Sequence, residues 1–418
     1  MTRRQRHLPV LSPREGRRLP EELRPENVAP LAAALPAGLR DPGFAELLHR
    51  IDQGPVLGGN RVRIWTRGDE AFASVCEAIG QARSEVLVES YILKDDATGR
   101  AFAGRLAEAA ARGVSVKVLA DFFGSFATRS RFWRALRRRG VEVRLFHPLF
   151  PHLLFQPFRD HRKIIVVDRR VAFTGGMNIS DEYGSARGGS HRGPWRDTQA
   201  RVEGPTAWEM AVVFSEAWGR AGGSIALEPL ESGPEGGVPI LTVDSRPGRG
   251  HGETAATLAA IVAAARRRVW ITNAYFAPRM EAVEHLRGAV RRDVDVRLLL
   301  PGQSDVPIVR HAGHGYYRRL LEIGVRVFEY RAAILHAKTL VADGHASMVG
   351  STNLDFRSFH FNAECNLVFL DAEVGGRFEE TFQDDLTRSE EITAAVWRRR
   401  RPLHALGDSA ARLLAPVL

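Results

Sequence analysis

One spaced set of five residues occurs twice in this chain, and any fold for the chain must accommodate both copies. Each copy reads H-x-K-x4-D-x6-G-x-x-N, first within HRKIIVVDRRVAFTGGMN and again within HAKTLVADGHASMVGSTN. The residues are His161, Lys163, Asp168, Gly175 and Asn178, and then His336, Lys338, Asp343, Gly350 and Asn353. The repeat indicates an internal duplication. Two halves that each supply one imidazole and one ammonium can build a single phosphate-handling site between them.

Lysine usage separates these motifs from chance matches. Of 59 basic residues only four are lysines, and two of the four stand in the motifs. A compact, rotatable ammonium differs from the planar arginine fork, and a crowded site around one phosphorus can require it. A single H-x-K would normally belong to a surface strand. The matched pair, with Asp, Gly and Asn at equal offsets, favours a functional site instead.

The segments before the two motifs show the same predicted order of elements. Before the first motif we expect strands at 85–93, 114–121 and 141–146, with helices at 99–112 and 131–139. Before the second we expect strands at 268–275, 294–301 and 325–330, with helices at 281–292 and 314–323. This order predicts an α/β fold of two pseudo-symmetric domains, each a mixed sheet flanked by helices. Within each motif, His and Lys alternate along a strand and therefore point to one face.

Composition suggests five segments. They are a basic N-terminal arm at 1–50 with at most one short helix near 30–50, a first domain at 51–230, a glycine- and proline-rich linker at 231–252, a second domain at 253–395, and a basic, amphipathic segment at 396–418. The stretch 145–158 is apolar and broken by prolines. It is either a surface that dips into a membrane or a loop buried under the second half. The C-terminal segment either lies on anionic lipid or packs on the protein.

The charge and the cysteine count limit the classes of protein. A formal charge of +10 and a pI near 10.2 imply an anionic partner, which could be a nucleic acid, a phospholipid surface or a phosphorylated substrate. Cys76 and Cys365 cannot form a disulfide framework. No apolar stretch approaches the roughly 18–20 residues that span a bilayer. We therefore expect a soluble protein on the cytoplasmic side, peripheral to a membrane. His311 and His314 lack a further metal ligand nearby, so neither a metal nor a cofactor is expected.

The duplicated motif resembles that of the phospholipase D superfamily. The surrounding stretches GGMNISDEYG, WRDTQARVEGP, AARGVSVKVLADFFGS, NAYFAP and GSTNLDFRSFHFNAE are similar to bacterial cardiolipin synthases, and the resemblance covers about residues 55–400. It departs at Gly176, where many superfamily members have serine. It also departs in having no N-terminal pair of membrane helices, which places the chain with a shorter, non-spanning branch. The resemblance implies one composite active site at the interface between the two domains.

The residues support the chemistry that this resemblance implies. A neutral imidazole can attack phosphorus to form a phosphohistidine, while a second, protonated imidazole donates to the departing alkoxide. We assign the attack to His161 and the acid/base role to His336, although the pseudo-symmetric sequence does not fix that order. Charge on the phosphoryl oxygens is expected to be held by Lys163, Lys338, Asn178 and Asn353. At Gly176 and Ser351, where the turns end, the backbone can approach an oxyanion closely.

Five aspartates and a glutamate remain to be placed. Each histidine needs an acceptor on its other ring nitrogen, and we assign Glu364 to His336 and Asp197 to His161. Asp168 and Asp343 belong to the catalytic motif of the resemblance. Because they end buried strands, we expect them to brace a loop by accepting backbone hydrogen bonds. Asp121 and Asp305 are expected to be structural.

Several functions are compatible with these residues. The first is a phosphatidyltransferase that moves a phosphatidyl group to an alcohol such as phosphatidylglycerol, with phosphatidylethanolamine as a further candidate substrate and an anionic membrane as its surface. The second is a phospholipase D hydrolase, in which water resolves the intermediate. A nuclease would use the same residues, but no aromatic-basic interleaving indicates a nucleic-acid groove, so no nucleic acid is expected. A catalytically inactive binding protein is disfavoured because both motifs are intact.

Overall fold

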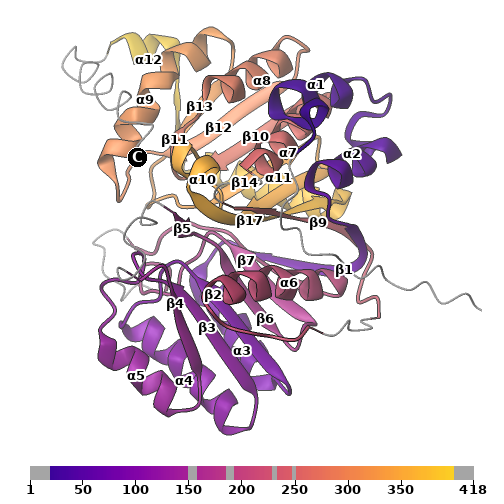
Figure 1. Ribbon diagram of the computed structural model, residues 1–418. Coiled ribbons are helices and arrows are strands. Elements are labelled where there is room, and N and C mark those ends of the chain that lie inside the picture. Colours follow the sequence, from indigo (N-terminus) through magenta and orange to yellow (C-terminus); the bar gives the residue numbers. More distant parts are fainter. Residues whose placement is uncertain (1–18, 149–157, 185–192, 228–232, 247–250, 400–418) are drawn as a thin grey trace, which may run out of the picture.

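One mixed sheet passes through both halves of the protein. The computed structural model describes residues 19–148, 158–184, 193–227, 233–246 and 251–399. The strands of the sheet follow one another in the order β4-β3-β2-β6-β7-β8-β1-β9-β17-β15-β14-β10-β12-β13-β18. Read from its two ends toward the centre, this order is nearly a mirror of itself, as an internal duplication requires. Figure 1 shows the two halves one above the other, the first in indigo to magenta and the second mainly in orange to yellow.

The two halves use equivalent strands. In the first half they are β1 (Val56–Trp65), β2 (Glu85–Ser90), β3 (Ser115–Asp121), β4 (Glu142–Phe146), β6 (Lys163–Val167), β7 (Val171–Gly175) and β8 (Gln199–Glu203). In the second they are β9 (Val238–Ser245), β10 (Arg268–Asn273), β12 (Asp295–Pro301), β13 (Arg326–Tyr330), β14 (Lys338–Ala342), β15 (Ala346–Gly350), β17 (Asn362–Leu370) and β18 (Ser389–Ile392). The strands β2, β3 and β4 are parallel, as are β10, β12 and β13. Each motif forms an antiparallel hairpin, β6–β7 or β14–β15.

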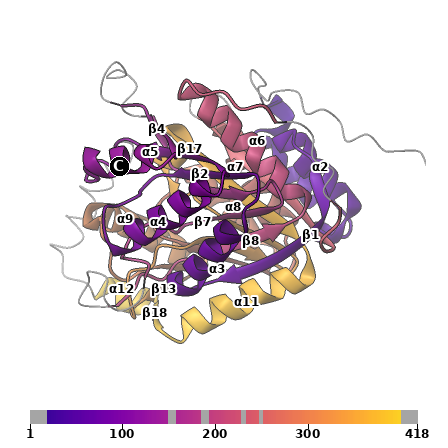
Figure 2. The same ribbon diagram turned by 90° about the horizontal axis from the view of Figure 1, so that it is seen from below.

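Helices cover both faces of the sheet. In the first half they are α3 (Gly68–Gln81), α4 (Ala97–Ala111), α5 (Ser130–Arg138) and α6 (Pro205–Arg220). In the second half they are α7 (His251–Ala264), α8 (Met280–Val290), α9 (Pro307–Glu322), α10 (Phe356–His360), α11 (Ala372–Leu386) and α12 (Ala394–Arg398). Figure 2 shows α3 and α4 on the underside of the first half and α11 along one edge of the view. The buried cores on the two faces are apolar, which explains why β2 and β10 read as near-continuous runs of buried residues.

The alternation of strands and helices predicted in each half is confirmed, with small shifts at the ends. The largest shift is in α9, which begins at Pro307 and not at residue 314. Proline at the first helical position has the backbone angle that a helix needs and lacks only an N–H that would be unbonded there. Pro307 was therefore the sequence signal for the earlier start of α9.

The expected N-terminal arm was wrong for residues 19–52. Two helices, α1 (Pro25–Ala33) and α2 (Pro42–Asp52), pack on the second half of the chain, where Figure 1 shows them in indigo above the sheet. Their buried residues include Val28, Ala32, Phe44, Leu48 and Ile51. Prolines suggested a broken chain, but Pro25 and Pro42 stand at helix starts, and Asp41 caps α2 by accepting from the Gly43 amide. Residues 1–18 lie outside the described residues.

The expected linker at 231–252 was also wrong over much of its length. Residues 238–245 form β9, a central strand that pairs with β1 on one side and β17 on the other. Pro239 argued against a strand because proline cannot donate to a sheet ladder. It is tolerated here because the β9–β17 pairing begins at Ile240, and β1 has a bulge between Leu57 and Asn60 opposite the proline. The chain therefore crosses between the halves through the middle of the sheet.

Two further expectations fall largely outside the described residues. Of the apolar stretch 145–158, residues 149–157 are not described, and neither are residues 400–418 of the C-terminal segment. The described start of that segment packs on the protein, since the Trp397 ring lies 4.7 Å from the Tyr317 ring of α9. None of the described helices combines the length and the apolarity that crossing a membrane requires.

Candidate active site

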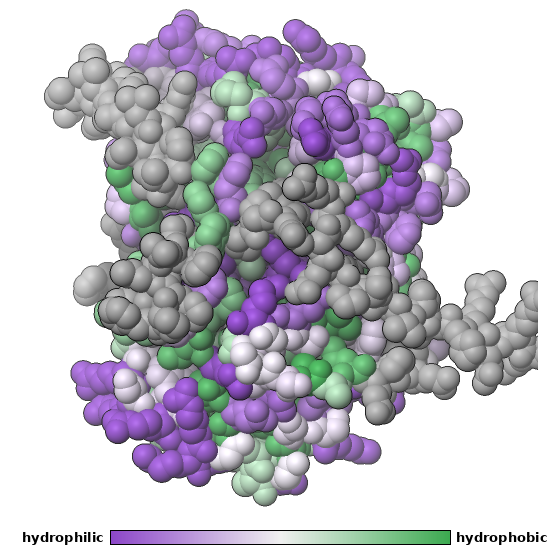
Figure 3. Space-filling view, viewed as in Figure 1, coloured by the Kyte–Doolittle hydropathy of each residue, from purple (hydrophilic) through white to green (hydrophobic). Residues whose placement is uncertain are grey.

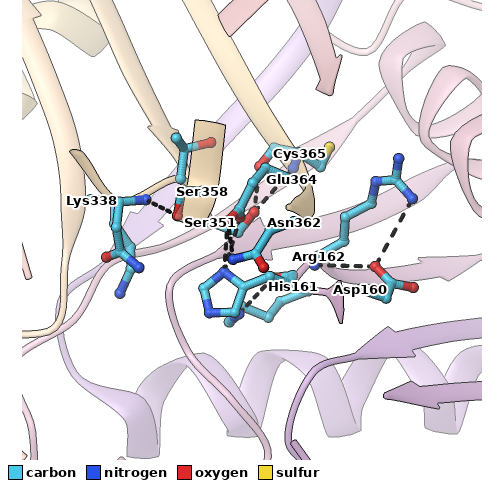
Figure 4. A network of polar contacts seen from close by, with 12 residues as sticks. Asp160, His161, Arg162, Lys338, Ser351, Ser358, Asn362, Glu364 and Cys365 are labelled. Carbon is cyan, nitrogen blue, oxygen red and sulfur yellow. Dashed lines mark hydrogen bonds and ion pairs between the residues drawn. The ribbon is translucent and has the colours of Figure 1, made fainter. Parts of the chain in front are cut away.

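Sheet pairing between the halves places the first histidine. The two-residue strand β5 (Arg159–Asp160) pairs in parallel with the start of β17, so that Asp160 lies opposite Ala363. The next residue, His161, donates its amide to the Ala363 carbonyl at 2.9 Å. This register brings His161 beside Glu364, whose two carboxylate oxygens lie 3.0 and 3.1 Å from His161 Nδ1. Figure 4 shows the two side chains pointing toward each other.

The second histidine is placed by the same arrangement with the halves exchanged. Arg196 and Leu335 form an isolated parallel bridge, and the His336 amide donates to the Arg196 carbonyl at 2.7 Å. His336 consequently lies beside Asp197, with 2.7 Å between His336 Nδ1 and Asp197 Oδ2. In both cases the carboxylate is one residue after the bridging residue of its own segment. The histidine is likewise one residue after the bridging residue of the other segment.

The pairing of histidines and carboxylates expected from the sequence is therefore reversed. Glu364 orients His161, and Asp197 orients His336, so each carboxylate serves the motif of the other half. The sequence assignment took nearness along the chain as nearness in space. It failed because the segments that carry the carboxylates pair across the interface between the halves. Removal of either half would leave the remaining histidine without its acceptor, so the two motifs form one composite site.

Both motif lysines are buried next to the histidines. Lys163 donates to the His161 carbonyl at 2.6 Å, and Lys338 Nζ lies 2.9 and 3.1 Å from the two ring nitrogens of His336. Each ammonium also faces a tyrosine ring, Lys163 that of Tyr91 and Lys338 that of Tyr275. A buried ammonium next to a histidine can hold an anionic ligand. These lysines can therefore hold phosphoryl oxygens, as their spacing from the histidines predicted.

Burial controls the protonation of the His161 side of the site. Burial lowers the pKa of His161 to about 4, although Glu364 opposes that change. Burial likewise lowers the pKa of Lys163 to about 7 and that of Lys338 to about 8, with nearby carboxylates opposing both. Burial tends to raise the pKa of Glu364, but His161, Lys163 and a hydrogen bond from Ser351 hold it below its usual range. At neutral pH, His161 is a neutral imidazole that donates from Nδ1 to a carboxylate and presents the lone pair of Nε2.

The His336 side has a different set of neighbours. Burial lowers the pKa of His336, and Lys338 lowers it further, whereas the Asp197 carboxylate opposes both. The Tyr183 hydroxyl lies 3.1 Å from His336 Nδ1 and accepts from Asn178 Nδ2 at 3.0 Å. The two histidines are thus equivalent in sequence but not in environment. An anion bound between the halves would favour the protonated form of His336, as an opposite charge nearby always does.

The two asparagines lie in equivalent places with an unused oxygen. The side-chain Oδ1 atoms of Asn178 and Asn353 are both buried without a hydrogen-bond partner among the described residues. A buried amide group without a full set of partners is costly, which marks it as a candidate contact for a ligand. The nitrogen and oxygen ends of a carboxamide exchange by a simple flip. Each asparagine can therefore present an N–H to a phosphoryl oxygen.

Gly176 and Ser351 lie against the orienting carboxylates. A Cβ at Gly176 would collide with the carboxylate of Asp197, so only glycine fits while Asp197 stays beside His336. The Ser351 hydroxyl accepts from the Cys365 amide at 3.0 Å and also bonds to Glu364. The departure at Gly176 from the usual serine therefore has a packing reason. Both residues therefore lie against the carboxylates that orient the two histidines.

The motif aspartates lie at the far ends of the strands, as their positions in the sequence suggested. Asp168 accepts from the amides of residues 83–85 at 2.8–2.9 Å, and Asp343 accepts from those of residues 266–268 at 2.8–2.9 Å. Asp168 thus holds the turn before β2, and Asp343 holds the turn before β10. Asp121 is buried and pairs with Arg159, while Asp305 accepts from the Tyr275 hydroxyl at 2.7 Å. These four aspartates support the site without reaching into it.

Several contacts of the site were missed by sequence reasoning. Tyr91 packs edge-on against His161 with ring centroids 4.8 Å apart, and Tyr183 and Tyr275 lie about His336. Tyr183 lies inside GGMNISDEYG and Tyr275 inside NAYFAP, and these two stretches were the available signal for them. Arg196 forms a bidentate ion pair with Asp385 of α11 at 2.6 and 2.9 Å. Nothing in the sequence pairs those two residues, because they are separated by 189 positions.

Among the described residues, no group of three or more His, Cys, Asp and Glu side chains is arranged to hold a metal ion. His314 lies 3.0 Å from Glu329, which also contacts Arg310 and Tyr317. That cluster belongs to the packing of α9 against β13.

Known proteins share both the sequence and the fold. A family model described as cardiolipin synthase, PLD-like domain, matches residues 75–186 and 258–386. Cardiolipin synthase A of Pseudomonas fluorescens (strain SBW25) is 38% identical, over 87% of this chain and 76% of its own. Cardiolipin synthase 1 of Bacillus anthracis is 32% identical, over 100% of this chain and 84% of its own.

Solved structures extend the likeness to the fold. The phosphatidylserine synthase of Haemophilus influenzae Rd KW20 superposes with a TM-score of 0.70 at 13% identity, over 90% of this chain and 99% of its own. A polyphosphate kinase from Porphyromonas gingivalis superposes with a TM-score of 0.54 at 13% identity, over 84% of this chain and 50% of its own. Both matches show a shared fold, and the sequence relatives carry the family assignment.

Proposed function

The chain belongs to the cardiolipin synthase family of phospholipase D-like phosphatidyltransferases, and on that premise we propose that it transfers a phosphatidyl group through a phosphohistidine to the alcohol of phosphatidylglycerol. The observation that supports this most is the exchange of carboxylates between the halves. It gives two imidazoles, each held at Nδ1 by a carboxylate of the other half. Two buried ammonium groups beside them provide charge for one phosphodiester.

The first step forms the covalent intermediate. Nε2 of His161 attacks the phosphorus of the donor lipid, and a bond forms between that nitrogen and phosphorus. The bond from phosphorus to the headgroup oxygen breaks, and His336 gives its proton to the departing alkoxide. Lys163 and Lys338 hold the negative oxygens as charge builds on them. Glu364 stabilises the positive charge that His161 gains when it is phosphorylated.

The second step reverses the first with a new alcohol. A hydroxyl of the acceptor gives its proton to His336 and attacks the phosphorus, and the bond to His161 breaks. With phosphatidylglycerol as both donor and acceptor, the products are cardiolipin and glycerol. Water in place of the acceptor would make the reaction a hydrolysis. The burial of both histidines, which are 7% and 4% exposed, favours transfer because it limits the access of bulk water.

The test is to identify the products from three substrates. Labelled phosphatidylglycerol, phosphatidylethanolamine and plasmid DNA are each incubated with the wild-type protein, and the products are separated. We expect labelled cardiolipin from phosphatidylglycerol and intact DNA. His161→Ala and His336→Ala should each abolish the transfer, whereas His311→Ala on α9 serves as a matched control and should retain it. Phosphatidic acid as the main product would establish a hydrolase instead, and nicked DNA would establish a nuclease.

We also propose that the protein meets its lipids as a peripheral protein at an anionic membrane surface on the cytoplasmic side. The support is the net charge of +10, which attracts anionic lipid electrostatically. Binding to vesicles that contain phosphatidylglycerol should therefore weaken as salt rises, and vesicles of neutral lipid should bind less. Binding that ignores salt and lipid charge would contradict this attachment.

A further inference from the structure

A large apolar cavity lies in the second half, between helices α1, α7, α8 and α10. Its volume is about 720 Å³, within the range of about 300–1,000 Å³ typical of ligand sites. Its walls are mainly hydrocarbon, among them the side chains of Ala255, Leu258, Phe276, Val283, Leu286 and Phe359. Figure 3 shows hydrophobic atoms in green recessed between hydrophilic ones in this upper half. The residues that line the cavity have no role in the bond-making and bond-breaking steps described above.

The cavity reaches the strand that carries the second motif lysine. Leu340, which lines it, follows Lys338 by two positions on β14 and so lies on the same face of the sheet. Leu354, another lining residue, directly follows Asn353. A smaller cavity lined by Lys338 shares Leu258, Leu340 and Leu354 with the large one. A ligand with its phosphate at Lys338 would therefore have this apolar space directly behind it.

The other end of the cavity has polar, exposed side chains. Arg24 and Glu26 of the α1 region, and Arg279 and Glu281 at the start of α8, line the cavity and are exposed to solvent. They mark where it opens. The apolar walls between the two ends suit a hydrocarbon chain rather than a peptide, because a peptide would bury backbone N–H and C=O groups that these walls cannot bond.

We propose that this cavity binds an acyl chain of the phospholipid whose phosphate occupies the composite site. The inference rests on the proposed function, because it assigns the cavity to the lipid substrate of that same reaction. The headgroup phosphate would lie at Lys338, and one acyl chain would run along β14 past Leu340 and Leu354. Each buried methylene contributes about 0.8 kcal/mol, so the cavity would make the enzyme prefer substrates with long chains.

The experiment fills the cavity and varies the chain length of the substrate. Ala255→Trp places an indole in the cavity from α7, and Ala33→Trp on the exposed side of α1 is the matched control. Both are assayed on phosphatidylglycerol with long acyl chains, presented in detergent micelles, and on a soluble analogue with short chains. We expect Ala255→Trp to lower kcat/KM for the long-chain lipid at least ~10-fold, which corresponds to the loss of about two buried methylenes. The short-chain rate should stay within about two-fold, and Ala33→Trp should change neither.

A direct label covers the case in which Ala255→Trp does not fold. Wild-type protein is irradiated with a long-chain phosphatidylglycerol that carries a photoreactive diazirine near the end of one acyl chain. Cross-links on peptides of α7 or α8 support the proposal, and cross-links confined to other elements overturn it. An equal loss of activity on both chain lengths in a folded Ala255→Trp protein also overturns it. If the wild-type protein transforms neither lipid, the proposed function fails, and that result is distinct from a failure of the cavity.

Discussion

Replacing Glu364 by glutamine tests whether a carboxylate of the second half positions the histidine of the first. Glu364 is fully buried, and both of its oxygens lie within 3.1 Å of His161 Nδ1. Glutamine keeps the volume but removes the negative charge. A hydrogen bond to a charged group contributes about 1.5–3 kcal/mol. Since His161 becomes positive as it is phosphorylated, the loss of that bond should slow its attack by about 10- to 150-fold.

The assay isolates the attack from the departure of the headgroup. A phosphodiester with an activated phenol as leaving group needs no proton from His336, so its release in a rapid-mixing burst reports the attack by His161 alone. Glu364→Gln should slow the burst by the factor above. Asp197→Asn should leave the burst nearly unchanged and slow the later resolution of the intermediate, which needs His336 as a base. Thermal unfolding of both variants close to that of the wild-type protein shows that the folds are intact.

The opposite pattern would refute the crossed assignment. If Asp197→Asn slowed the burst and Glu364→Gln left it unchanged, either the carboxylates would serve the histidines of their own halves or His336 would be the nucleophile. The single variant His336→Ala separates these two cases, because its burst from the activated substrate stays intact only when His161 attacks.

Three further predictions concern the charge, the packing and the interface of the site. Raising the pH through about 7 should lower kcat/KM, because burial lowers the pKa of Lys163 to about 7 and Lys163 loses its positive charge above that pH. A flat pH–rate profile up to pH 9 would contradict this prediction. Gly176→Ala should lower kcat about 100-fold, because the added methyl displaces the Asp197 carboxylate. Gly58→Ala, where the added methyl meets open space, should leave kcat unchanged. Equal rates in the two variants would refute the packing argument. Arg196→Ala should cost about 3–5 kcal/mol in urea unfolding because it leaves the buried Asp385 carboxylate of α11 without its ion pair, whereas Arg318→Ala, which removes an exposed pair, should cost far less. Similar losses in the two variants would contradict this prediction.

The sequence predicted the repeated fold because local patterns specify it. Apolar runs such as that of β2 and the alternation with alanine-rich helices depend on nearby residues. The duplicated motif likewise located both histidines and both lysines. These are the parts of the molecule in which neighbours along the chain are neighbours in space.

The errors arose where pairing across the two halves decides the structure. The assignment of Glu364 to the wrong histidine is one example, because the register between β5 and β17 has no local signal. The strand β9 is another, since Pro239 disfavours a strand until the bulge in β1 opposite it is known. Helices α1 and α2 were missed because their apolar residues are scattered among prolines and charges, and α7, on which both pack, lies about 200 positions further along the chain.

The most direct test of the composite site is to locate the covalent intermediate. Wild-type protein is mixed with labelled phosphatidylglycerol, quenched within the first turnover, digested, and the labelled peptide is identified by mass spectrometry under conditions that preserve phosphohistidine. We predict a phosphatidyl group on His161, less of it in Glu364→Gln at the same time, and none in His161→Ala. A label on His336, or steady formation of cardiolipin with no labelled histidine, would contradict the account.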